Sequence, residues 1–300
     1  MISVLRRTGV TLVELVVALA LFGVVAAIML TVVRQQQQFH VGSLEIIETK
    51  RSAQQAIDLL YGELRAVSSA DIYAISDSSI SFRTTFGTSH VCAIDSGRAA
   101  IVLPPVGPAR AAPLSTFLTT PRAGDSLLIL DPGDAADGTD DRWRPHVLTA
   151  APGGGTCPLR PFGLASSAVE TAGRAITIAP ALTEHVVPGS PVRFVRPASY
   201  SLYRGTGSVW MLGYSSCAAG TCTTRQPLSG PYLPFATGGA GGVAFRYFDH
   251  DGAPTADPSR IARIDVVARA RSASALDVGH VRGQRYRDSL AVTISLRNAS

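Results

Sequence analysis

The stretch Gly9-Val10-Thr11-Leu12-Val13-Glu14 and the apolar run behind it, from Leu15 to Val33, decide the fold of this chain. Only Gly23 and Thr31 interrupt the apolar run. From Leu12 to Val33 is 22 residues, which is about 33 Å of α-helix at roughly 1.5 Å per residue. That length is enough to cross the hydrocarbon core of a membrane.

The charges around this run predict its orientation. Arg6 and Arg7 precede it, and only Arg34 follows closely. Because basic residues are retained on the cytoplasmic side, we expect the N-terminus in the cytoplasm and everything after about residue 34 outside it. A secretory signal peptide has a similar basic start and small residues such as Val25-Ala26-Ala27.

Two features argue against a signal peptide. The run is longer than the roughly 7–15 apolar residues of such a signal. Glu14 also lies just inside the apolar segment, where an ionisable side chain costs on the order of 2–3 kcal/mol or more and normally has a partner. An uncleaved signal anchor that carries Glu14 remains the alternative.

Gly9 to Glu14 resembles the processing signature of type IV pilins and type II secretion pseudopilins. The resemblance implies that a prepilin peptidase cuts after Gly9 and that the new amine of Val10 is methylated. It also implies that Glu14, then at mature position five, pairs with the N-terminal amine of a neighbouring subunit. A buried carboxylate and a buried ammonium would offset each other's desolvation cost. The family usually has Phe where this chain has Val10.

An apolar stripe continues beyond the span, at Ala53, Ile57, Leu60, Leu64 and Val67. This i, i+4, i+7, i+11, i+14 spacing predicts one amphipathic helix face. No proline occurs before Pro104, so a single helix from about Val10 to Val67 is expected. The expected organisation is a leader at 1–9, a transmembrane half-helix at 10–33, an amphipathic half-helix at 34–67 and an extracytoplasmic β-rich domain at 68–300.

Short β-type runs separated by turn residues follow residue 68, and short connections between them favour antiparallel pairing. The expected fold is α+β and pilin-like, with the long helix packed on an antiparallel sheet that carries long irregular loops. The predicted strands are Ser79–Thr84, His90–Ile94, Ala100–Leu103, Ser126–Leu130, Ala175–Ala179, Val192–Val195, Ser208–Leu212, Val243–Phe248, Ile261–Ala270 and Ser289–Arg297.

The C-terminal succession of strands, with the Asp-Gly turn at Asp251-Gly252, is similar to the larger J-type pseudopilins and related minor pilins. That resemblance implies a structural minor subunit anchored in the inner membrane by one span, with its C-terminal domain in the periplasm or on a filament. The implied partners are the prepilin peptidase, other minor subunits, the major subunit and the inner-membrane assembly platform.

Four cysteines follow the apolar run: Cys92, Cys157, Cys217 and Cys222. An even number in an extracytoplasmic domain favours disulfides. The favoured pairing of the three possible is Cys217–Cys222, which closes a small loop, with Cys92–Cys157. A four-thiolate zinc site is the alternative, although the CxxC spacing of such sites is missing.

Aspartates crowd one Gly-containing loop, at Asp131, Asp134, Asp137, Asp140 and Asp141. Clustered carboxylates can hold calcium, but the spacing does not fit an EF-hand, and a solvated loop is the favoured interpretation. Glycines 153–155 are predicted to lie in a linker or turn.

No hydrolase elbow, Walker loop, dinucleotide fingerprint or paired metal-binding histidines occur in the sequence, so neither an enzyme nor a cofactor is predicted. The alternatives left open are an exported or signal-anchored enzyme, cleaved near Ala27, and an adhesion or DNA-binding module. The arginines are dispersed among acids, so binding to nucleic acid is not expected.

The composition agrees with a membrane-anchored globular protein. Of 300 residues, 46% are apolar, and the mean hydropathy is +0.22, which excludes a disordered chain. The formal charge of +5 falls to 5 − 2 = +3 if Arg6 and Arg7 leave with the leader.

Overall fold

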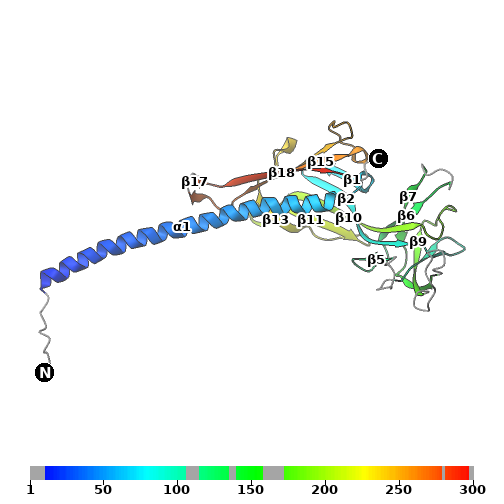
Figure 1. Cartoon of the computed structure of the whole chain (residues 1–300), viewed down its shortest axis with the longest axis horizontal. Helices are drawn as coiled ribbons and strands as arrows, with labels where there is room; N and C mark the ends of the chain where they lie inside the picture. The colour runs from blue at the N-terminus through cyan, green and yellow to red at the C-terminus, as the bar shows by residue number, and fades with distance from the viewer. Residues whose placement is uncertain (1–10, 106–114, 135–139, 158–171, 279–280, 297–300) are drawn as a thin grey trace, which may run out of the picture.

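The computed structural model describes residues 11–105, 115–134, 140–157, 172–278 and 281–296, and every structural statement here refers to those residues. The first element is helix α1, Leu12–Leu64, which is continuous over 53 residues and therefore about 80 Å long. Its N-terminal half extends alone, and its C-terminal half lies on a β-sheet (Figure 1). The helix ends three residues before the predicted Val67, in a turn in which Ala66 N donates to Glu63 O at 3.2 Å.

The predicted apolar stripe is the face that α1 buries. Ala53, Leu60 and Leu64 have no exposed surface, and Ile57 is partly buried. They pack in one core with side chains of the sheet: Phe82, Tyr200, Leu212, Tyr232, Phe245, Ile264, Val266 and Ile294. The amphipathic pattern is therefore confirmed as a packing face within the subunit.

Hydrogen bonds fix the position of α1 along its axis on the sheet. Ser52 Oγ donates to Gly230 O at 2.9 Å, and Tyr232 OH donates to Ser52 O at 2.7 Å. Burial raises the pKa of Tyr232 to about 12, so this phenol stays protonated and keeps donating. A helix that is tied by both apolar and polar contacts has one register on its sheet.

The strands form one antiparallel sheet of 16 strands and a separate hairpin of two. Their bounds are β1 Ile72–Ser76, β2 Ser79–His90, β3 Ala93–Ile94, β4 Ala100–Leu103, β5 Thr116–Phe117, β6 Ser126–Asp131, β7 Arg142–Leu148, β8 Gly153–Thr156, β9 Ala172–Ala179, β10 Pro191–Arg204, β11 Trp210–Ala218, β12 Thr221–Cys222, β13 Gln226–Tyr232, β14 Val243–Phe248, β15 Arg263–Arg271, β16 Leu276–Val278, β17 Val281–Gln284 and β18 Arg287–Ser295. The α+β class with antiparallel pairing is confirmed.

Two long strands, β2 and β10, pair from Ser79↔Ser201 to His90↔Pro191 and carry two separate cores. We call the part that packs on α1 the helix-side lobe. The distal lobe consists of the described residues between 91 and 190 and the ends of β2 and β10 on which they pack. The core of the distal lobe contains Ile101, Leu103, Leu127, Ile129, Ile176 and Phe194. The distal lobe lies beyond the C-terminal end of α1, around β6, β7 and β9 (Figure 1).

The strand predictions succeed where the run is apolar. Ala100–Leu103 and Val243–Phe248 have the predicted bounds, whereas β2 and β10 extend well past their predicted ends. The predicted strand His90–Ile94 is wrong as one element, because His90 ends β2 and β3 begins at Ala93. Residues 153–155 are also corrected: they lie in β8, which pairs with β9.

Candidate functional site

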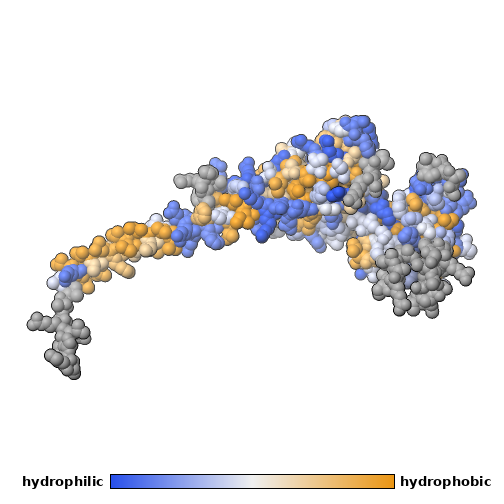
Figure 2. All heavy atoms as spheres, in the orientation of Figure 1, coloured by the Kyte–Doolittle hydropathy of each residue, from blue (hydrophilic) through white to orange (hydrophobic). Residues whose placement is uncertain are grey.

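The N-terminal half of α1 is apolar on all sides and carries no packing partner within the described chain. Leu12, Phe22 and Met29 expose 79%, 72% and 62% of their surface. This segment is long and apolar enough to cross a membrane, and none of it is buried. Figure 2 shows it as a continuous hydrophobic rod that ends where polar residues begin. A helix that is hydrophobic all round needs lipid or other helices as its surroundings.

Glu14 lies in the first turn of this helix and closes a capping box with Thr11. Its Oε2 accepts from Thr11 N at 2.9 Å and from Thr11 Oγ1 at 3.0 Å. Glu14 N in turn donates to Thr11 Oγ1 at 3.3 Å. The box and the positive end of the helix dipole together hold the carboxylate at the helix N-terminus. Gly9 and Val10 lie outside the described residues.

A second exposed apolar surface follows the polar residues Arg34 to Gln38. A groove along α1 is lined by Val32, Phe39, Leu44 and Ile47. Phe39, Leu44 and Ile47 each expose more than half of their surface. The apolar surface that α1 offers therefore continues past the apolar run, up to the stripe that packs in the helix-side lobe.

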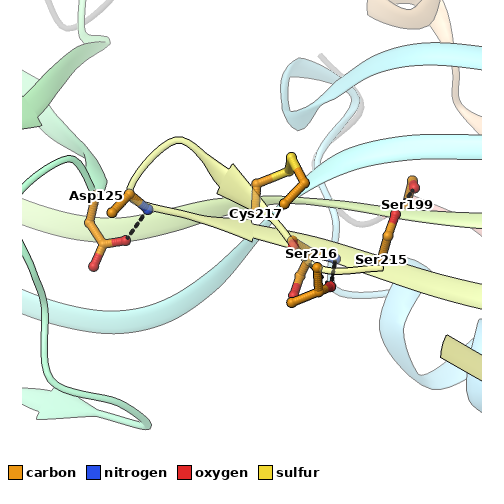
Figure 3. Close-up of a disulfide and its surroundings, with 8 residues drawn as sticks. Asp125, Ser199, Ser215, Ser216 and Cys217 are labelled. Carbon is orange, nitrogen blue, oxygen red and sulfur yellow. Dashed lines mark hydrogen bonds between the residues drawn. A yellow bond between two sulfur atoms is a disulfide. The ribbon is translucent and has the colours of Figure 1, made fainter. Parts of the chain in front are cut away.

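The four cysteines form two disulfides, Cys92–Cys157 and Cys217–Cys222, in the pairing that the sequence analysis favours. The first is fully buried and ties the start of the distal lobe to the end of β8. The second closes the β11–β12 hairpin, where Cys217 pairs with Cys222 across the strands (Figure 3). Because all four sulfurs are engaged, the four-thiolate zinc alternative is wrong.

The tip of the β11–β12 hairpin contacts the distal lobe. Ala219 N donates to Asp125 Oδ1 at 3.3 Å, and Figure 3 shows the Asp125 carboxylate facing the turn. Gly124 has a φ of +88°, and a Cβ there would lie 3.0 Å from the Ala219 Cα. Glycine is therefore required at this contact.

The Asp125 carboxylate also binds Arg196 of β10 through both oxygens, at 3.0 and 2.8 Å. The Asp125 side chain is completely buried, and the Arg196 guanidinium lies 3.9 Å from the centre of the Phe86 ring. Burial acts to raise the pKa of Asp125, but the hydrogen bonds and charge of Arg196 outweigh it, so the pKa lies below its ordinary value. We call Asp125, Arg196 and Ala219 the lobe clamp.

The acidic loop does not assemble a metal site in the part of the chain that is described. The Asp131 carboxylate is bound within the fold. Thr183 Oγ1 donates to it at 2.8 Å, and Arg144 Nε also donates to it. The Asp140 carboxylate accepts from Asp134 N at 2.8 Å, and Asp137 lies outside the described residues. Among those described, no group of three His, Cys, Asp or Glu could hold a metal ion.

Sequence reasoning missed the lobe clamp and a group of three arginines, Arg271, Arg285 and Arg287. The clamp draws its members from positions 125, 196 and 219, and no local pattern connects them. The sequence does carry a weak signal for the arginines, because Arg285 and Arg287 lie two positions apart just before a predicted strand. Their proximity to Arg271 depends on the pairing of β15 with β18.

The family model for the prokaryotic N-terminal methylation motif matches residues 5–30. This match supports the type IV pilin and pseudopilin family, and it covers the segment that contains Gly9, Val10 and Glu14. No curated protein and no solved structure matches the chain.

Proposed function

We propose that this chain, which carries the N-terminal methylation motif of type IV pilins and pseudopilins, is a structural minor subunit of a type IV pilus or type II secretion filament. The observation that carries the proposal is the division of α1. Its C-terminal half is built into a folded domain, and its N-terminal half presents an apolar rod without a partner. A subunit that is stored in a membrane and then packs by its helix in a filament requires this division.

The maturation step falls at Gly9 in this proposal. A prepilin peptidase removes residues 1–9 and exposes the amine of Val10, which is then methylated. The chain is anchored in the inner membrane by one span, with its β-domain in the periplasm until it enters the filament. The size of the domain and the order of its C-terminal strands support a minor subunit, most like the J-type pseudopilins. Other minor subunits, the major subunit and the inner-membrane assembly platform are its partners.

Glu14 directs assembly in this proposal. The capping box places its carboxylate at the start of the helix, on Thr11, the residue that follows Val10 in the sequence. In the apolar interior of a filament, an unpaired carboxylate is costly, and the amine of a neighbouring subunit can neutralise it. The pairing would set the axial position of one subunit against the next.

Replacing Glu14 with Gln is expected to reduce incorporation into filaments at least tenfold. Gln keeps the size and the hydrogen-bonding capacity of the side chain but cannot form the ion pair. Incorporation is measured as the share of the chain in a sheared filament fraction, in cells with the complete assembly system. The matched control, Glu48→Gln, removes an exposed carboxylate farther along the same helix and is expected to assemble normally. Wild-type incorporation of the Glu14 variant would refute the role of the carboxylate.

A further inference from the structure

Three arginines converge at the end of the helix-side lobe that lies nearest the free half of α1. Arg271 ends β15 and pairs across the sheet with Arg287, the first residue of β18. Burial, followed by the charges of Arg285 and Arg287, holds the pKa of Arg271 below its ordinary value. The charges of Arg285 and Arg287 therefore act on the Arg271 guanidinium, and we call these three residues the basic cluster.

No ion pair within the described chain neutralises the basic cluster. Arg271 Nε is buried without a hydrogen-bond partner. Two acids lie on adjoining elements. The Glu45 carboxylate accepts from Ala273 N at 3.0 Å, and Asp288 follows Arg287 along β18, so its side chain points to the opposite face of the strand. Among the described residues, the three arginines outnumber these two acids, so the cluster carries a net positive charge that favours an anionic ligand.

The position of the cluster follows from the hairpin of β16 and β17, which reaches along α1 toward its free half (Figure 1). Leu276 lines a groove with Gln38 and Val41 of the helix, and it pairs with Gln284, the residue before Arg285. Along the helix axis, Gln38 and Val41 lie about 8 and 12 Å beyond Val33, where the apolar run ends.

These distances lie just beyond the lipid headgroups and within the range of their charge. The headgroup layer extends roughly 5–7 Å beyond the hydrocarbon core, and the electrostatic field of an anionic membrane extends about 8 Å further at physiological ionic strength. Arg285 therefore lies within reach of the headgroups when α1 spans the bilayer, with Arg287 and Arg271 behind it. Arginine binds phosphate through two parallel N–H groups, which suits it to this ligand.

We propose that Arg271, Arg285 and Arg287 form a surface that binds anionic phospholipid headgroups while the chain is anchored in the membrane. The proposal rests on the proposed function, because it requires α1 to span the bilayer. The contact would hold the β-domain close to the membrane before assembly. Extraction of the helix into a filament would move the cluster away from the headgroups and would end this contact.

The test compares hydrogen exchange of the full chain in nanodiscs of phosphatidylcholine alone and of phosphatidylcholine with one-third phosphatidylglycerol. Each exposed arginine near an anionic surface contributes a factor of about five in binding, so Arg285 and Arg287 together contribute a factor of about twenty-five. Exchange of backbone amides in segment 281–287 is therefore expected to slow by up to about twentyfold in the anionic discs. High salt should remove most of this protection, because screening weakens the attraction.

Two matched variants locate the effect. Replacing Arg285 and Arg287 with Gln is expected to abolish the lipid-dependent protection. The control replaces Arg142 and Arg246, two exposed arginines on other strands, with Gln. It removes the same charge and is expected to leave the protection intact. Equal exchange of the wild-type segment in both discs, or protection that survives the Arg285/Arg287 replacement, would overturn the proposal.

Two further readouts distinguish lipid binding from failed membrane anchoring and from binding of a free anion. Amides of residues 15–30 should be strongly protected in both discs, because the helix is then in lipid. Rapid exchange there would show that the chain is not anchored, and would overturn the proposed function together with this inference. Inorganic phosphate added to the neutral discs should not protect segment 281–287, and protection by phosphate would assign the cluster to a free anion instead of a lipid.

Discussion

Replacing Leu60 with Ala is expected to lower the free energy of unfolding by about 2–5 kcal/mol. The Leu60 side chain is fully buried in the core that joins α1 to the sheet. Its truncation removes apolar contacts and leaves a cavity that a helix tied at Ser52 cannot close by shifting. Denaturant unfolding of the full chain in detergent, followed by the fluorescence of Trp210 at the edge of that core, measures the change.

Leu44→Ala is the matched control, because it makes the same substitution on the same helix. Leu44 exposes 54% of its surface, so its truncation should change the unfolding free energy by less than about 0.5 kcal/mol. The same variant is expected to weaken incorporation into filaments, since Leu44 lines the exposed groove on α1. A comparable loss of stability in both variants would contradict the division of α1 into a packed half and a free half.

Replacing Asp125 with Ala is expected to lower the free energy of unfolding by about 3–5 kcal/mol. The substitution leaves Arg196 without its partner in a site where the side chain is only 16% exposed, and an uncompensated buried charge is strongly destabilising. It also removes the acceptor for Ala219 N and so loosens the contact between the lobes. Single-tryptophan variants that keep either Trp143 in the distal lobe or Trp210 in the helix-side lobe allow unfolding of the two lobes to be followed separately.

Two controls test the cause. The double variant Asp125→Ala/Arg196→Met removes both charges, and it is expected to recover part of the lost stability. Arg260→Ala breaks the more exposed pair with Asp249, since the Arg260 side chain is 63% exposed, and should cost no more than about 1 kcal/mol. Equal losses for the Asp125 and Arg260 variants would show that the lobe clamp does not stabilise the fold.

The lobe clamp also predicts a pH dependence. The pKa of Asp125 is lower in the folded chain than its ordinary value, so the unfolded chain binds more protons at acidic pH. The contribution of Asp125 is therefore complete above the unfolded pKa, near 4, and is lost as the pH falls through the folded value. The Asp125→Asn variant should show a shallower loss of stability between about pH 5 and pH 3 than the wild type.

The features that the sequence predicts well are local in the chain. The apolar run, the helical stripe and the signature around Glu14 each occupy neighbouring positions, so their spacing alone defines the helix and the face that it buries. The disulfide across the β11–β12 hairpin is local in the same sense. Strands that are mostly apolar runs, such as β4 and β14, are also predicted with the bounds that the structure shows.

The features that the sequence does not reveal depend on contacts between distant segments. β7 contains Arg142-Trp143-Arg144-Pro145 and is mostly exposed, so it becomes a strand only because β6 and β9 pair with it. β8 is largely glycine and is ordered by β9 in the same way. The lobe clamp and the basic cluster are likewise assembled by pairings across the sheet, which no local pattern encodes.

The proposed function requires that this chain is processed as a prepilin and not as a secreted protein. Intact mass and N-terminal sequencing of the chain, produced with and without a prepilin peptidase, test it directly. With the peptidase, we expect a mature protein that has lost residues 1–9 and begins with a methylated Val10. A chain that keeps residues 1–9 in the presence of the peptidase, or one that begins near Ala27, would contradict the account.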